Sequence, residues 1–161
     1  MVSPRERNVQ PDLAILLVAA ARTVADVLGS AVADAGVEDM RSQFGFVLRA
    51  AGERGVTLTE LANRLAVTKQ AAIKVVDEME RRGLVEREAH PDDRRAKLIA
   101  PTARGLRVRN AALKASREME RGLRRVAGDA DVDALRRALT ELLGTHGGLE
   151  DAIAGRARPV W

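Results

Sequence analysis

The sequence contains no cysteine and no tyrosine, and its aromatic residues are two phenylalanines and one tryptophan. Without cysteine the chain has no disulfide, no cysteine-ligated zinc and no thiol redox sensor. Because aromatics are so few, a core has to be built from Leu, Val, Ile and Ala, which suits helix packing. With 46% hydrophobic and 31% charged residues among 161, the chain is too apolar for a wholly disordered protein. It has the length of one domain, or of one domain with dimerisation arms.

Long hydrophobic runs are also missing. The longest, Leu13 to Ala21, is nine residues, whereas a helix needs about 20 to cross a bilayer. No basic segment followed by an apolar stretch and a small-residue cleavage site opens the chain. We therefore expect a soluble cytoplasmic protein without a membrane partner.

Motifs of enzymes and of metal sites are lacking as well. His90 and His146 stand alone, with no second ligand at metal-binding spacing. The sequence offers no Ser/His/Asp arrangement and no phosphate-cradling glycine loop. Asp92 and Asp93 are adjacent in a turn-forming segment, so their carboxylates should point apart. We expect no enzyme activity, no metal and no cofactor.

Positive charge is present, and it is concentrated in one stretch. Residues 81–125 hold fourteen Lys and Arg against six Asp and Glu, a net charge of +8, while the whole chain carries only +4. A single basic stretch indicates a surface that faces a polyanion. A solvated arginine-rich helix explains the charge equally well. For the basic residues from Arg104 to Arg125 we favour that explanation, with only the first few of them near DNA.

The central part of the chain predicts two short helices with almost no linker. Thr59 is placed to cap the first helix, and Thr68 to cap the second, which ends at Gly83. The small residues Ala62 and Ala66 at the contact would let the two helices cross closely. This is the sequence form of a helix-turn-helix.

A β-hairpin is expected directly afterwards. Residues 84–88 alternate in part and are predicted to form a strand, and residues 97–100 are predicted to form a second one, which Pro101 cuts short. The loop between them carries Arg94 and Arg95 at its tip. A hairpin after a helix-turn-helix is a wing. The combination is a much more specific indication than either half.

Amphipathic helices flank this lobe on both sides, over residues 12–33, 38–51 and 102–127, with a last helix capped by Asp131. The fold is predicted to be mainly α with a small β-wing. The divisions are N-terminal helices for dimerisation and support at 1–52, a winged helix-turn-helix lobe at 53–101, C-terminal dimerisation helices at 102–146 and a tail at 147–161. The apolar faces of the terminal helices exceed what a small lobe could bury, which predicts a homodimer.

The stretch from Leu58 to Gly105, LTELANRLAVTKQAAIKVVDEMERRGLVEREAHPDDRRAKLIAPTARG, resembles the multiple-antibiotic-resistance regulator (MarR) family of bacterial transcription regulators. The matching pieces are Val-Thr-Lys-Gln at the second helix, the Gly-Leu-Val exit into the wing, and Asp93-x-Arg95 followed by Thr102-x-x-Gly105. Pro101 departs from the family's apolar residue and puts the last hydrogen bond of its strand in question. The resemblance implies a homodimeric repressor of double-stranded DNA, relieved by a small apolar or phenolic ligand.

The second helix of a helix-turn-helix presents its amino-terminal residues to base edges in the major groove. Gln bonds adenine, Lys reaches guanine acceptors, and Thr or Lys binds phosphate. The residues expected to contact DNA there are Thr68, Lys69, Gln70, Ala71 and Lys74. Four apolar residues of the same helix are assigned mainly to the core, although the first can face outward: Ile73, Val75, Val76 and Met79.

At the wing, Arg94 and Arg95 fit insertion into a narrow minor groove. The resemblance makes Arg95 the groove-facing arginine and Asp93 the carboxylate that orients it. Lys97, Arg64 and Arg82 are predicted phosphate contacts.

Two other functions fit the same sequence. A winged-helix module that binds protein would have no salt-dependent DNA affinity and would tolerate Arg95→Ala. A sequence-neutral architectural protein would bind every duplex similarly, whereas a regulator prefers its site by about 10³-fold or more.

Overall fold

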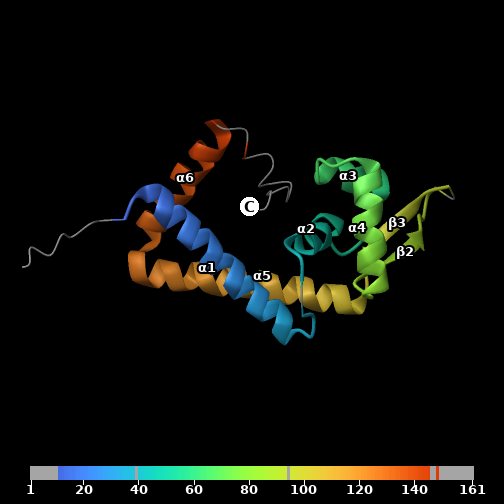
Figure 1. Cartoon of the computed structure of the whole chain (residues 1–161), viewed down its shortest axis with the longest axis horizontal. Helices are drawn as coiled ribbons and strands as arrows, with labels where there is room; N and C mark the ends of the chain where they lie inside the picture. Colours follow the sequence, from blue (N-terminus) through green and yellow to red (C-terminus); the bar gives the residue numbers. More distant parts are fainter. Residues whose placement is uncertain (1–10, 39, 94, 146–147, 149–161) are drawn as a thin grey trace, which may run out of the picture.

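The computed structural model describes residues 11–38, 40–93, 95–145 and 148 and is elongated, with a helix-and-sheet lobe at one end and a helical arm at the other (Figure 1). The predicted tail falls outside the described residues, except residue 148. The elements in chain order are α1 (Leu13–Asp34), α2 (Ser42–Ala51), β1 (Val56–Thr57), α3 (Leu58–Arg64), α4 (Lys69–Arg81), β2 (Val85–Ala89), β3 (Lys97–Pro101), α5 (Ala103–Ala127) and α6 (Asp129–Thr145).

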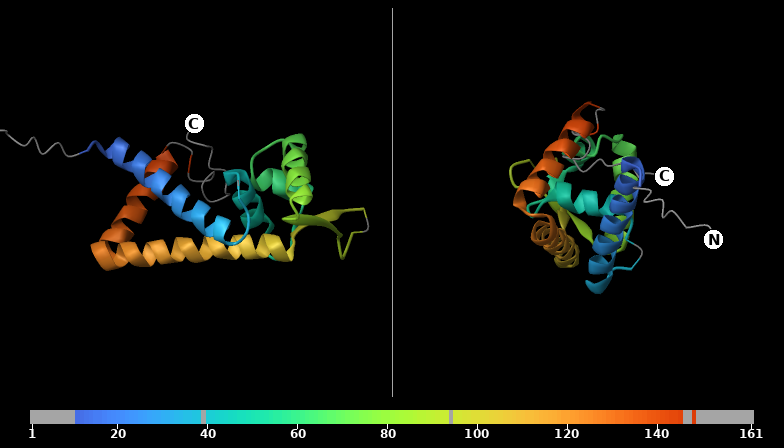
Figure 2. Two further views of the ribbon diagram at one scale, coloured as in Figure 1. Left: turned by 60° about the horizontal axis from the view of Figure 1, so that its bottom comes forward. Right: turned by 90° about the vertical axis from the view of Figure 1, so that its left-hand side faces the viewer.

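The long helix α5 forms the axis of the molecule. Figure 2 shows α1 crossing over α5, α6 folding back from its far end, and the β2–β3 hairpin projecting from the opposite end. The mainly α fold with a small β-wing is therefore confirmed. The lobe that carries the hairpin and the arm that carries α6 lie at opposite ends of one helix.

The hydrophobic core lies inside the lobe, and α2 belongs to it. Its largest fully buried side chains come from α2, α3, α4, the sheet and the start of α5: Phe44, Leu48, Leu61, Met79, Leu84, Ile99 and Val108. Burying a side chain of this size stabilises the fold by about 1.5–3 kcal/mol. The core therefore fixes α4 and the wing relative to one another.

The amino end of α3 is capped by Thr57, and the prediction that Thr59 caps it was wrong. The Thr57 hydroxyl accepts a hydrogen bond from the Glu60 backbone N–H at 3.2 Å, and the Glu60 carboxylate accepts one from the Thr57 N–H at 3.0 Å. This reciprocal pair is a capping box. The Thr57 N–H bond lowers the pKa of Glu60 because it favours the ionised form.

The sheet has the order β1-β3-β2, with both pairs antiparallel. Pro101 lies in β3 opposite Val85 and does not end the pairing, because the next residue, Thr102, donates its N–H to the Leu84 carbonyl at 3.1 Å. The alternation of antiparallel hydrogen bonds then turns the nitrogen of Pro101 away from β2. The nitrogen therefore faces the β1 side of β3, where β1 pairs only with Ile99 and Leu98, so no strand–strand hydrogen bond is lost at Pro101.

Helix α1 is longer and more apolar than the nine-residue run suggested. Its 22 residues include an 18-residue window of mean hydropathy 1.8, and only 6% of that window is buried within the chain. By length and composition alone such a helix could cross a membrane. The nine-residue apolar run therefore does not exclude a membrane-spanning helix, and that expectation was wrong. Apolar side chains with high exposure include Leu13, Ile15 and Leu16.

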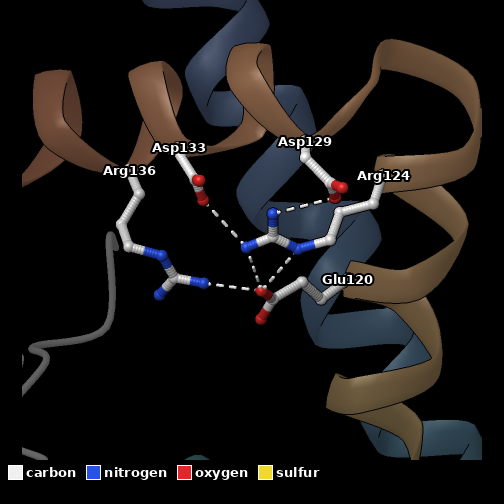
Figure 3. Close-up of polar contacts among 5 residues, drawn as sticks. All are labelled: Glu120, Arg124, Asp129, Asp133 and Arg136. Atoms are coloured by element: carbon white, nitrogen blue, oxygen red, sulfur yellow. Dashed lines mark hydrogen bonds and ion pairs between the residues drawn. The ribbon is translucent and has the colours of Figure 1, made fainter.

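An ion-pair cluster, which we call the elbow network, joins the end of α5 to α6 (Figure 3). Arg124 donates to Glu120 at 3.0 Å, to Asp129 at 3.2 Å and to Asp133 at 2.9 Å, and Arg136 reaches Glu120 at 2.7 Å. Both arginines lower the pKa of Glu120, while the three carboxylates raise the pKa of Arg124. α6 begins at Asp129, so Asp131 lies in its first turn and the prediction that Asp131 caps it was wrong.

Candidate DNA interface

The amino end of α4 is organised by Thr68, as expected of a cap. Its hydroxyl accepts a hydrogen bond from the Ala71 N–H at 3.2 Å, and its carbonyl accepts one from the Ala72 N–H at 3.0 Å. No acidic residue stands in the first turn. The first backbone N–H groups and the positive end of the helix dipole therefore form a favourable position for a phosphate.

The outward face of α4 carries the predicted reading residues. Lys69, Gln70 and Lys74 are exposed, and none of their side chains has a hydrogen bond or an ion pair within the described part of the chain. Ala71 is half-buried beside them. The three polar side chains are consequently available to a partner that offers acceptors, as the edges of guanine and adenine do.

The α3–α4 turn depends on small residues, although not on both that were predicted. Ala62 on α3 and Ala72 on α4 are buried, and the two helices pack against each other. Ala66 is exposed and has φ of +45°, so it forms the turn and not the helix contact. The Val67 N–H closes the turn by donating to the Ala62 carbonyl at 3.1 Å. This geometry sets the angle at which α4 leaves the lobe.

The wing tip is held by side-chain acceptors. The His90 Nδ1 accepts hydrogen bonds from the backbone N–H groups of Asp92 and Asp93, both at 3.2 Å. The Asp93 carboxylate in turn accepts a bond from the backbone N–H of Arg95 at 2.9 Å. Asp93 thus orients the Arg95 main chain. Arg94 lies outside the described residues.

The remaining predicted contacts lie on the rim of the lobe. Lys97 is exposed at the start of β3. Arg64 donates to the Ala50 carbonyl at 2.6 Å, and so ties α3 to the carboxyl end of α2. Arg64 has a structural role within the lobe, and its phosphate contact stays a prediction.

Comparison with known proteins places this geometry in a family. The sequence profile of the MarR family matches residues 42–96, which include the helix-turn-helix and most of the wing. CouR from Rhodococcus jostii RHA1, solved with p-coumaroyl-CoA, is 30% identical, with a TM-score of 0.57, over 81% of this chain and 91% of CouR. The chain belongs to the MarR family.

Other solved structures have the same fold. A MarR-family transcriptional regulator from Rhodococcus sp. RHA1 is 27% identical, with a TM-score of 0.56, over 81% of this chain and 93% of that one. The Staphylococcus aureus MepR–DNA complex is 19% identical, with a TM-score of 0.64, over 84% and 99%. No curated protein matches the sequence. As a MarR-family member, the chain is a DNA-binding transcription regulator and not an enzyme.

Arg87 is a residue of this MarR-family lobe that the sequence reasoning missed. It lies on β2 and pairs with Asp77 at 2.6 Å and with Glu80, both on α4. The pairs fasten the wing to the reading helix, and they neutralise two carboxylates that would otherwise repel phosphates. The available signal was the alternation of β2, which puts Arg87 on the same face as the buried Val85.

A group of contacts around Glu78 fastens the carboxyl end of α4. It includes Arg82, whose predicted phosphate contact stays a prediction. Glu78 pairs with Arg41 and with Arg82, both at 2.9 Å, and the Arg82 guanidinium lies 5.1 Å from the centre of the Phe44 ring. Arg104 donates to the carbonyls of Arg82 and Gly36, which joins α4 to the end of α1. The interpretation of Arg104 as merely solvated was incomplete.

Proposed function

We propose that this chain is a sequence-specific repressor that binds a pseudo-palindromic operator as a homodimer in the cytoplasm and releases it when a small ligand binds. The observation that carries the proposal is a set of three polar side chains at the amino end of an exposed helix, Lys69, Gln70 and Lys74, which have no partner among the described residues. Those residue types, placed there, match the donor and acceptor pattern of the major groove.

Each remaining residue has a role in that binding mode. Thr68 and the first N–H groups of α4 bind a phosphate, and the small side chain of Ala71 lets the α4 backbone approach the DNA closely. Arg94 and Arg95 enter the minor groove from the wing, where a narrow groove concentrates negative potential. Lys97 and Arg64 contact phosphates and contribute affinity without sequence preference.

The homodimer accounts for apolar side chains that a monomer would leave in water. These side chains lie on α1, at the end of α5 and on α6, and the most exposed, Val126, is 89% accessible: Leu13, Ile15, Leu16, Val27, Leu123, Val126, Leu135 and Leu142. Large apolar patches on soluble proteins mark interaction sites. A two-fold pair of such arms would set two copies of α4 about 34 Å apart, one turn of DNA.

The ligand proposal rests on kinship with CouR, which was solved with p-coumaroyl-CoA. We infer that a small apolar or phenolic compound, or its thioester, weakens operator binding by this chain. The test measures release of the chain from its operator when hydroxycinnamates or their coenzyme A thioesters are added. Coenzyme A alone is the control. This tests the ligand separately from DNA recognition.

Salt-titrated fluorescence anisotropy tests the central proposal. DNA upstream of the chain's own gene, or a duplex selected from a random library, is compared with a scrambled duplex. The wild type is measured beside Gln70→Ala/Arg95→Ala and beside Arg117→Ala, which removes an exposed charge from α5 outside the lobe. We expect selective binding that salt weakens, that the double variant loses and that Arg117→Ala keeps. Equal binding to both duplexes indicates an architectural protein, and no binding indicates a protein-interaction module.

A further inference from the structure

Ile73 is an apolar residue on the outward side of α4. It is 36% exposed, while its neighbour Ala72 is 1% exposed, and Val76 and Met79 are fully buried. The core therefore takes one side of the helix, and Ile73 lies at the exposed margin of that side. Val75 is partly buried against that core, so of the four residues assigned mainly to the core Ile73 alone is exposed.

The position of Ile73 on the helix is that of a base-reading residue. It lies three and four residues after Gln70 and Lys69, so its side chain neighbours theirs on the helix surface. Lys74 follows it, and all three polar neighbours are exposed. In a helix-turn-helix, the first turns of this helix are the part that meets base edges.

Exposure alone does not assign a role, because single apolar residues are common on protein surfaces. Two features distinguish Ile73. It is a β-branched residue on an exposed helix face, where it lowers helix propensity relative to Lys or Gln. Its polar neighbours Lys69, Gln70 and Lys74 also have no partner within the described residues, so this part of the helix surface is available to another molecule.

The charge around Ile73 permits a duplex to approach. Asp77, four residues later and exposed on the same side, has its carboxylate held by Arg87 at 2.6 Å. Arg87 also pairs with Glu80, the nearest acidic residue on the next turn. Ile73 is thus flanked by Lys69 and Gln70 on its amino-terminal side, by Lys74 next to it, and by neutralised carboxylates on its carboxyl-terminal side.

We propose that Ile73 is a specificity-determining residue that packs against the 5-methyl group of a thymine in each operator half-site. The inference rests on the proposed function and deepens it. The 5-methyl of thymine is an apolar group at the edge of the base in the major groove, and apolar side chains recognise it by contact. The 5-methyl of 5-methylcytosine offers the same chemistry at a different base, and we assign the contact to thymine.

The test combines a change in the protein with a change in the DNA. In the selected operator, thymines are replaced by deoxyuridine at one position at a time, in both half-sites together. The replacement removes only the methyl group. For the wild type, one thymine per half-site should respond, with affinity lowered about fourfold for each methyl lost. Ile73→Ala should bind the thymine duplex with that lower affinity and should no longer distinguish thymine from deoxyuridine at that position.

Matched variants keep the result interpretable. Ile73→Val retains a branched apolar side chain and should keep the preference, and Lys97→Ala should weaken binding to both duplexes equally. Equal wild-type binding to thymine and deoxyuridine at every position would overturn the inference, as would an undiminished preference in Ile73→Ala. If 5-methylcytosine at a cytosine position is the only methyl that matters, the assignment to thymine is wrong. Absence of any preference for the operator over scrambled DNA would instead refute the proposed function.

Discussion

Gly105, in the first turn of α5, lies where a methyl group cannot fit. A Cβ built on it would stand 2.0 Å from the Leu84 carbonyl oxygen and 3.1 Å from Leu48 Cδ2. An ordinary contact between carbon and a carbonyl oxygen is about 3.3–3.6 Å, so Gly105→Ala requires a shift of more than 1 Å. The carbonyl cannot yield easily, because it accepts the Thr102 N–H at 3.1 Å and joins the wing to α5.

The magnitude follows from three contributions. Overpacking costs about 1–3 kcal/mol, and a lost hydrogen bond at the Leu84 carbonyl costs about 1 kcal/mol. Replacing a helical glycine by alanine returns about 1 kcal/mol. We expect Gly105→Ala to lower the free energy of unfolding by about 1–3 kcal/mol, which is a fall of about 2–12 °C in Tm for a chain of this size.

The matched control is Gly45→Ala on α2, where the added Cβ would meet only Met40 Cε at 3.8 Å. That variant should gain up to about 1 kcal/mol from helix propensity. Thermal unfolding followed by circular dichroism measures both variants, at one protomer concentration because association raises Tm. A Gly105→Ala protein as stable as the wild type would refute the reasoning, and so would an equal loss in Gly45→Ala.

Three further perturbations test other contacts. The folded-state pKa of Glu120 is lowered from 4.5, so its contribution to stability is present above that pH and is lost as the pH falls. The Tm of Glu120→Gln should therefore lie below that of the wild type at neutral pH and converge with it in acid. Parallel curves of Tm against pH would contradict this. His90→Phe removes the acceptor for two wing-tip N–H groups, and should lower DNA affinity severalfold with little change in Tm, as anisotropy and thermal unfolding can check. Arg87→Met should weaken DNA binding more at low salt than at high salt, because two carboxylates of α4 become unpaired. Arg87→Lys should retain most of the affinity. The same loss of affinity at every salt concentration would argue against the electrostatic role of Arg87.

The lobe could be predicted from the sequence because its signals are local. Thr68 followed by a helical pattern, Gly83 at its end and a turn-rich hairpin each constrain the backbone within a few residues, and the structure places all of them as expected. The capping box was also local, since Thr57 stands three residues before Glu60, and that spacing should have been preferred to Thr59.

Interactions between distant residues could not be predicted in the same way. Arg104 contacts a carbonyl 68 residues earlier, and an arginine on a helix looks the same in sequence whether it is solvated or bound. Ile73 and Ala72 are adjacent, and only the packing direction of α4 decides which is buried. The helical pattern over residues 12–33 was visible in the sequence, whereas a count of uninterrupted apolar residues stopped at nine and underestimated how apolar α1 is.

The most direct test of the central claim is a footprint of the chain on its selected duplex, by hydroxyl radicals and by methylation of guanine N7. We predict two major-groove patches with centres about 10 base pairs apart, each flanked by minor-groove protection from a wing. Gln70→Ala should change the major-groove pattern and Arg95→Ala the minor-groove pattern. A single patch, or uniform protection along the duplex, would contradict a homodimer that reads DNA with α4 and the wing.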